Sequence, residues 1–171
     1  MGNVMFMRKG EVHTAPVVFI AEDTYLLNAS DKCTDITGGY FIPYNYNEMR
    51  YSLTHANGIQ VYPNIDGEAG QIAVQTNSPI DLSRHKKLSA VLTTTGGTAV
   101  NTSTVKLVVC TASSGNPINS AIASVDFVWN GLTATAELDL SEIVGECYVA
   151  VYWNYPNTTH YGYITTIQLL T

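Results

Sequence analysis

The sequence has few charged residues, and most of those are acidic. Asp, Glu, Lys and Arg make up 13% of the 171 residues, hydrophobic residues make up 46%, and the formal net charge is -6. This composition predicts an ordered globular domain rather than a disordered chain. A chain of this length can bury enough apolar surface to fold as one domain without disulfides or metal. Nucleic-acid binders usually carry an excess of Lys and Arg, so the acidic balance argues against a nucleic-acid partner.

Cysteine is scarce as well. Cys33, Cys110 and Cys147 form no CxxC pair and lack the Cys/His spacing of a zinc site, and their odd number argues against a fully oxidised framework. Cys110 and Cys147 lie inside apolar runs, which favours two small buried hydrophobic residues over a disulfide between them. For Cys33, a free thiol and a disulfide between two chains are both open.

Long apolar runs are missing too. No segment reaches the ~20 apolar residues needed to cross a bilayer, so no membrane insertion is expected. The N-terminus lacks the long apolar core and the cleavage site of a secretory signal.

Recognisable catalytic motifs are absent. No nucleophile elbow, HExxH, P-loop or Rossmann glycine pattern occurs, and the four histidines lie far apart. Asp66 and Glu68 in a Gly-rich turn, or Glu137 and Asp139 on a predicted strand, could pair as carboxylates, but solvated side chains are the simpler interpretation. Asp66 and Glu68 are also the candidate calcium ligands, again against a plain acidic turn. We therefore expect a non-enzymatic protein without a cofactor; a jelly-roll hydrolase or lyase is the least favoured alternative.

Short β-forming runs fill the chain. In the second half, apolar, β-branched or aromatic runs recur every ten to fifteen residues and are followed by Gly, Asn, Pro or Ser. These runs cover residues 72–82, 88–96, 104–112, 121–131, 147–154 and 161–170. In the first half, Asn57-Gly58 between alternating residues predicts a hairpin, and Pro43 predicts an edge strand or a strand end. The pattern predicts an all-β sandwich or barrel with roughly eight to ten strands, as in a jelly roll.

Alternation assigns faces to several of these strands. Both faces of the run 147–153 are apolar, which predicts a central strand, with two sets of residues on opposite sides: Cys147, Val149, Val151 and Trp153 against Tyr148, Ala150 and Tyr152. The run 136–140 alternates apolar and polar residues, and in the run 125–129 the residues Val125, Phe127 and Trp129 alternate with Asp126 and Val128, so both runs predict strands buried on one face. Residues 1–37 differ in character and are expected to form an N-terminal arm with peripheral strands, while residues 38–171 form the sandwich.

Tyrosine is the most distinctive residue type. Eleven tyrosines accompany only four phenylalanines, and they concentrate in the segments YFIPYNYNEMRY and VYWNYPNTTHYGY. Tyrosine combines a flat apolar ring with a polar tip, which suits sugar stacking and protein interfaces, although several tyrosines are expected to be structural. If the two segments meet at one end of the sandwich, the candidate recognition residues are Tyr44, Tyr46, Trp153, Tyr155, His160 and Tyr161.

Several segments resemble a known family. The stretches CTDITGGY, AVQTNSPIDLSRHKKLSAVL, LDLSEIVGECYVAVYW and the ITTIQLL ending resemble the galactose-binding-like jelly-roll domains of bacteriophage and prophage tail proteins, over about residues 33–171. In those domains a short motif leads into a core strand, and the matching residues here are Ile80, Asp81, Leu82, Ser83 and Leu88. The opening MFMRKGEVHTAPV is similar to the N-terminal segment of phage virion proteins from Gram-positive hosts.

The resemblance implies a phage virion structural protein of the tail, baseplate, fibre or capsid surface, assembled in the host cytoplasm. Other virion proteins would be its partners, with an attachment arm that includes Arg8, Lys9, His13 and Pro16. It also implies a homo-oligomer, a trimer or larger, and a surface able to contact host glycans. The chain lacks an obvious paired-tryptophan platform for sugar. The alternative interpretation is a stand-alone carbohydrate-binding module.

Overall fold

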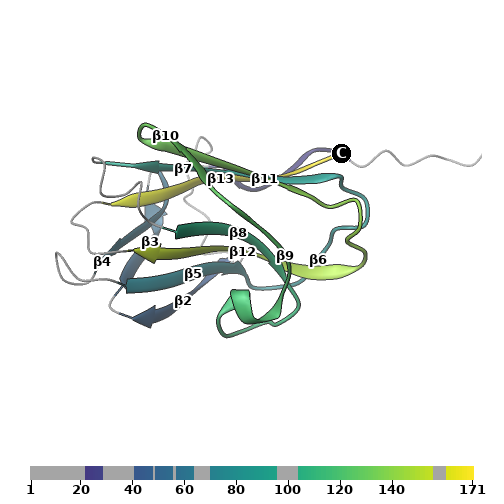
Figure 1. The fold of residues 1–171 in the computed structure, drawn as a ribbon, viewed down its shortest axis with the longest axis horizontal. Helices are drawn as coiled ribbons and strands as arrows, with labels where there is room; N and C mark the ends of the chain where they lie inside the picture. Colours follow the sequence, from purple (N-terminus) through teal and green to yellow (C-terminus); the bar gives the residue numbers. More distant parts are fainter. Residues whose placement is uncertain are drawn as a thin grey trace, which may run out of the picture.

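The structure is a computed structural model, and it describes residues 22–28, 41–47, 49–55, 57–63, 70–95, 104–155 and 161–171 (Figure 1). These residues form two antiparallel sheets that pack face to face. The first sheet contains β1 (Thr24–Asn28), β3 (Met49–His55), β4 (Gly58–Pro63), β7 (Lys87–Thr94), β10 (Val128–Asn130), β11 (Thr133–Asp139) and β13 (Gly162–Leu170). The second contains β2 (Phe41–Asn47), β5 (Gly70–Thr76), β6 (Ile80–Asp81), β8 (Thr104–Cys110), β9 (Ala121–Asp126) and β12 (Glu146–Tyr155). The predicted all-β sandwich is confirmed.

The strand order separates neighbours in sequence between the two sheets. The seven-stranded sheet has the order β10-β11-β7-β13-β4-β3, with β1 paired to the second half of β13. The six-stranded sheet has the order β2-β5-β12-β8-β9, with β6 paired to the start of β12. A 3-10 helix, η4 (Pro117–Ser120), joins β8 to β9. The described residues form thirteen strands, more than the roughly eight to ten predicted, and some of them are as short as β6 and β10.

The core lies between the sheets, where the alternation had placed it. In β12, Cys147, Val149, Val151 and Trp153 are at most 3% exposed and belong to the main core cluster. Ala150 and Tyr152 join a smaller cluster on the opposite side of the same strand. Because β12 lies between β5 and β8, the predicted central strand is confirmed.

Other local predictions also hold. The strands β3 and β4 pair across a turn in which His55 is opposite Gly58, whose φ of 112° is in the left-handed region that glycine tolerates. Pro43 lies on β2, an edge strand of the six-stranded sheet. Cys110 and Cys147 are buried free thiols. Burial raises the pKa of both thiols.

One run changes sheets in the middle. The residues 121–130 divide into β9 in the six-stranded sheet and β10 in the seven-stranded sheet, with Phe127 between them. Phe127 is 7% exposed and its N–H donates to the carbonyl of Val105 at 2.9 Å. The chain therefore passes from one sheet to the other while keeping the same side toward the core.

Part of the N-terminal segment belongs to the sandwich. Strand β1 pairs with β13, and Leu27 is 4% exposed in the main core. The carboxylate of Asp23 accepts hydrogen bonds from the backbone N–H and hydroxyl of Thr171, at 3.0 and 3.3 Å. Within the segment 1–37, residues 24–28 are thus a peripheral strand. The arm residues Arg8, Lys9, His13 and Pro16, and also Cys33, lie outside the described residues.

Within the described part of the chain, no helix is both long and apolar enough to cross a membrane.

Candidate functional site

Both tyrosine-rich segments cross between the sheets at the same end of the sandwich, the left end in Figure 1. The first runs from β2 to β3 with a single intervening residue, 48, and the second runs from β12 to β13 through residues 156–160. In the six-stranded sheet, Asn47 and Asn154 both stand opposite Gln71, near the start of β5. The two segments therefore flank the same strand at this end.

The candidate recognition residues differ in their exposure to solvent. Tyr161 is exposed, with 44% of its surface accessible. Trp153 is 1% exposed in the core, so its inclusion in a recognition surface was wrong. The backbones of Tyr44, Tyr46 and Tyr155 lie on β2 and β12, but their side chains are outside the description, as is all of His160.

The outer face of the seven-stranded sheet carries the described side chains best suited to recognition. Alternation turns every second residue of β7 and β11 away from the core, as their burial patterns show. Cross-strand pairing joins these residues to outward residues of neighbouring strands. We call this surface the tyrosine face; it comprises Tyr25, Arg50, Gln60, Tyr62, Lys87, Ser89, Thr93, Thr133, Glu137, Tyr161, Tyr163 and Gln168.

An aromatic corner forms one end of this face. The rings of Tyr62 and Tyr161 are 5.5 Å apart between centroids and lie at 75° to each other, an edge-to-face contact. The backbone of Tyr161 is held on both sides, since its N–H donates to Thr95 Oγ1 at 3.2 Å and its carbonyl accepts from Thr95 N at 3.1 Å and from Thr94 Oγ1 at 3.0 Å. An exposed ring on a fixed backbone is a preorganised contact for a ligand.

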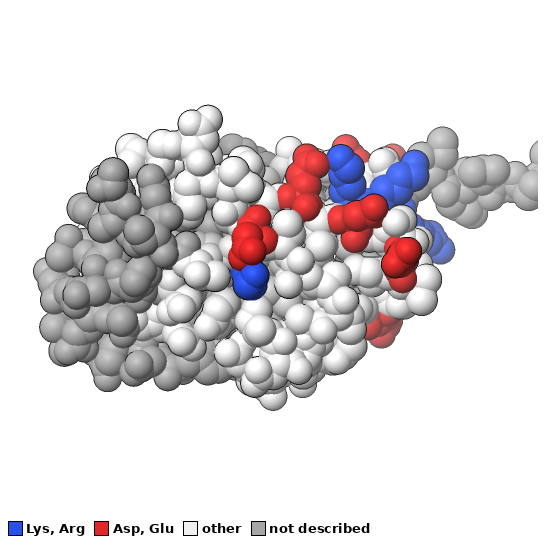
Figure 2. Space-filling model, viewed as in Figure 1, with Lys and Arg blue, Asp and Glu red and all other residues white. Residues whose placement is uncertain are grey.

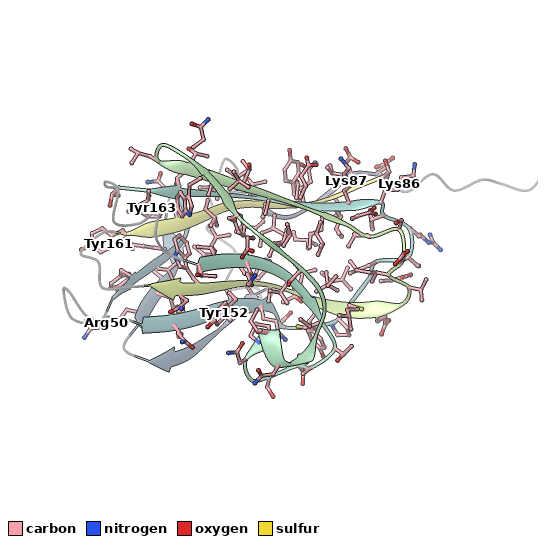
Figure 3. All side chains as sticks on the ribbon, in the orientation of Figure 1. Arg50, Lys86, Lys87, Tyr152, Tyr161 and Tyr163 are labelled. Atoms are coloured by element: carbon pink, nitrogen blue, oxygen red, sulfur yellow. The ribbon has the colours of Figure 1, made fainter. Side chains whose placement is uncertain are left out.

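Polar groups surround the aromatic corner. Gln60 Nε2 donates to the hydroxyl of Tyr163 at 3.4 Å, and Tyr163 itself is only 7% exposed. Arg50 stands opposite Tyr62 in the ladder and is exposed. Among the described acidic side chains, none forms an ion pair with Arg50. Figure 3 shows Tyr161 and Tyr163 at the left end of the sheet. Tyr163 is the second residue of β13, and Tyr161 directly precedes the strand.

Charges on this face are balanced at its other end. Lys87 Nζ lies 3.0 Å from Glu137 Oε2, and both side chains are more than half exposed. Such a surface pair contributes little to stability. Figure 2, which views the sandwich from the side, shows the described acidic and basic side chains between the middle of the molecule and its right end.

The outer face of the six-stranded sheet is less open. Ala73, Val108 and Ala150 are buried there, and Tyr152 is 8% exposed in the same cluster, against which Ile118 of η4 also packs. The buried amide of Gln75 is committed to the carbonyl of Ala112 at 2.8 Å. The ring of Tyr152 and the amide of Gln75 therefore support the fold and offer little surface to a ligand.

The described carboxylate of Asp139 is engaged in a local turn. Asp139 Oδ1 accepts the backbone N–H of Ser141 at 2.8 Å, and this bond, with the hydroxyl of Ser141, holds the pKa of Asp139 below its usual range. A groove of about 470 Å³ lies next to Asp139, lined by Ile122, Glu142 and Val144 among others. No group of three His, Cys, Asp or Glu able to hold a metal occurs in the described residues. The calcium candidates Asp66 and Glu68 lie outside them.

Most residues of the tyrosine face were not among the predicted recognition residues, although the sequence carries a signal for part of this face. In the run GIQVYP, Gln60 and Tyr62 alternate with Ile59 and Val61, which are fully buried. The same period of two that located the core therefore places Gln60 and Tyr62 on the outside.

Comparison with known structures places the fold beside carbohydrate-binding modules. A family 29 carbohydrate-binding module, in a variant made to probe ligand recognition, matches with a TM-score of 0.51 and 13% identity, over 87% of this chain and 91% of that chain. Another variant of that module, complexed with cellulohexaose, matches with a TM-score of 0.51 and 12% identity, over 86% and 89% of the two chains. At these identities the likeness concerns the fold.

A larger enzyme contains a similar fold. The glycoside hydrolase domain structure of Endo-D from Streptococcus pneumoniae R6 matches with a TM-score of 0.53 and 15% identity over 76% of this chain. The match covers 21% of that protein, so this chain spans about a fifth of its length. No family model and no curated protein matches the sequence.

Proposed function

We propose that this chain is a non-catalytic carbohydrate-binding β-sandwich that holds its ligand on the tyrosine face. This corresponds to the carbohydrate-binding alternative of the sequence analysis. The observation that carries the proposal is the aromatic corner of Tyr62 and Tyr161, set on a fixed backbone and continuous with a sheet face of amide and hydroxyl groups. A sugar ring presents an apolar C–H face to an aromatic ring and hydroxyls to polar neighbours, and this face offers both kinds of partner.

The fold neighbours support the same class of ligand. The family 29 modules share the sandwich over most of both chains, and one was determined with cellulohexaose. A sheet that fixes the positions of its side chains can present them without reorganisation on binding, which favours affinity.

Binding to oligosaccharides tests the proposal. Cello-, manno- and xylo-oligosaccharides of two and six units would be titrated into the full chain by calorimetry. Replacing Tyr161 by Ala should weaken binding about two- to twelvefold, because an aromatic contact contributes roughly 0.5–1.5 kcal/mol. Tyr161→Phe should retain most of the affinity.

Tyr51→Ala is a matched control. Tyr51 is 43% exposed, against 44% for Tyr161, but it stands opposite the core residue Val61 and is not part of the tyrosine face. Wild-type affinity in Tyr51→Ala with weakened binding in Tyr161→Ala supports the proposal. Equal affinities in wild type and Tyr161→Ala, or no binding to any of the three series, would refute it.

A second, finer proposal is that this domain belongs to a phage virion, where its ligand would be a host-surface glycan. The sequence resemblance supports this role, and its motif has a defined structural function in this chain. Ile80 and Asp81 form β6, the Asp81 carboxylate accepts the N–H of Ser83 at 3.0 Å, and Leu82 and Leu88 are fully buried at the entry to β7. Peptide mass spectrometry of purified particles should detect the chain in stoichiometric amount, and light scattering should give a trimer or larger. A chain absent from particles would contradict this role without touching carbohydrate binding.

A further inference from the structure

The tyrosine face has a second exposed ring at its far end. Tyr25 on β1 is 53% exposed and stands opposite Gln168 of β13. Gln168 in turn stands opposite Ser89, and Ser89 opposite Glu137. Residues directly opposite in an antiparallel ladder share a face, with Cβ atoms about 5 Å apart. The row therefore offers a ring, an amide, a hydroxyl and a carboxylate side by side.

The same chemistry occurs at the two ends of the face. At one end Tyr161 and Tyr62 adjoin the amide of Gln60, and at the other Tyr25 adjoins the amide of Gln168. Both ends lie on β13 or its immediate neighbours, so their separation follows from the strand itself. From Tyr163 to Gln168 is five residues, or about 17 Å at the usual rise of a strand.

The described side chains between the two ends are half-buried and protrude little from the sheet. Across the middle of the face, Thr166 of β13 stands opposite Val91 of β7, and both side chains are half-buried. Thr165, at the irregularity in this pairing, uses its hydroxyl to donate to the carbonyl of Val91 at 2.9 Å. A chain-like ligand can therefore follow β13 from one ring to the other without meeting a large side chain among these residues.

We propose that Tyr25, Gln168 and Ser89 form a second carbohydrate subsite, so that the ligand is an extended oligosaccharide held at both ends of β13 and not a single terminal sugar. This inference rests on the proposed function and assigns a binding role to β1, a strand from the N-terminal segment. Occupying both subsites is a multivalent contact, so the second subsite adds affinity only for ligands long enough to span the face.

Ligand length separates the two subsites experimentally. The wild type, Tyr25→Ala and Tyr161→Ala would be titrated with the disaccharide and the hexasaccharide of the cello, manno and xylo series. The wild type should bind the hexasaccharide of the preferred series more tightly than its disaccharide. Tyr25→Ala should lose about fivefold in hexasaccharide affinity, the loss expected for one aromatic contact, while Tyr161→Ala should weaken binding of both lengths.

Two controls protect the interpretation. Tyr25→Phe keeps the ring and should bind the hexasaccharide nearly as well as the wild type. Ile122→Ala changes a side chain 52% exposed on β9, in the other sheet, and should leave both affinities unchanged. Circular dichroism and thermal unfolding would show that each variant is folded.

The two proposals fail differently. If the wild type binds and Tyr25→Ala retains full hexasaccharide affinity, the second subsite is refuted and the proposed function stands. If the wild type binds none of the three series, the proposed function is refuted, and this inference with it.

Discussion

Replacing Gly162 by Ala tests whether the core is packed as described at the start of β13. A methyl group added at Gly162 would come within 2.8 Å of three carbons of the Trp153 indole, of which Cη2 is the nearest. The indole has little room to move, because it is 1% exposed and its centroid lies 6.3 Å from that of Trp129. Overpacking of this kind costs about 1–3 kcal/mol. For a domain of this length, that corresponds to a melting temperature roughly 2–12 °C lower.

Urea and thermal unfolding, followed by far-ultraviolet circular dichroism, would measure the loss. Trp153→Phe removes part of the indole and leaves space beside Gly162, so the double variant provides a control. The cost of Gly162→Ala should be smaller in the Trp153→Phe background than in the wild type, because residues in contact are not additive. Equal midpoints for wild type and Gly162→Ala, or strict additivity, would show that this ring is not held against β13.

Three further predictions concern the edge strand, acid stability and the thiols. Leu27→Ala should lower the free energy of unfolding by about 2–5 kcal/mol, because Leu27 on β1 is buried in the main core; an unchanged urea midpoint would show that β1 is not part of the cooperative unit. The lowered pKa of Asp139 means that its contribution is present above the unfolded-state pKa and is lost as pH falls through the folded value. Asp139→Asn should therefore lose less stability than the wild type between about pH 5 and about pH 2, and parallel losses in urea titrations would contradict this. Cys110 and Cys147 should resist iodoacetamide in the native protein and react in urea, since both are buried and burial raises their pKa; peptide mass spectrometry showing native labelling would contradict their placement.

Sequence patterns predicted strands and faces well, because alternation records what each side of a strand touches. The two sides of β12 were assigned correctly, because one side packs in the main core and the other packs in the smaller cluster that includes Ile118 of η4. The exchange of sheets at Phe127 could not be predicted. Val125, Phe127 and Trp129 keep one alternation while the chain leaves β9 and enters β10, so the hydrophobic pattern has no break there.

The candidate site was harder to predict, because it depends on pairing between distant segments. The face of Trp153 was predicted correctly, yet it was also placed among the recognition residues on the strength of its neighbours in sequence. Tyr25 and Gln168 are 143 residues apart and become adjacent only through the register of β1 against β13. The outward position of Tyr62 was predictable, since Tyr62 alternates with buried residues. No local pattern, however, indicates that its ring meets Tyr161.

Mapping the contact surface by nuclear magnetic resonance tests whether the tyrosine face binds carbohydrate. Backbone amide spectra of the isotope-labelled protein would be recorded with and without the hexasaccharide of the preferred series. We expect the largest shifts on β4, the start of β13 and β7, around Gln60, Tyr62, Tyr161 and Thr93, extending along β13 to Gln168. Shifts confined to β5, β8 and β12 would place the ligand on the other sheet and contradict this expectation, as would a spectrum that no oligosaccharide changes.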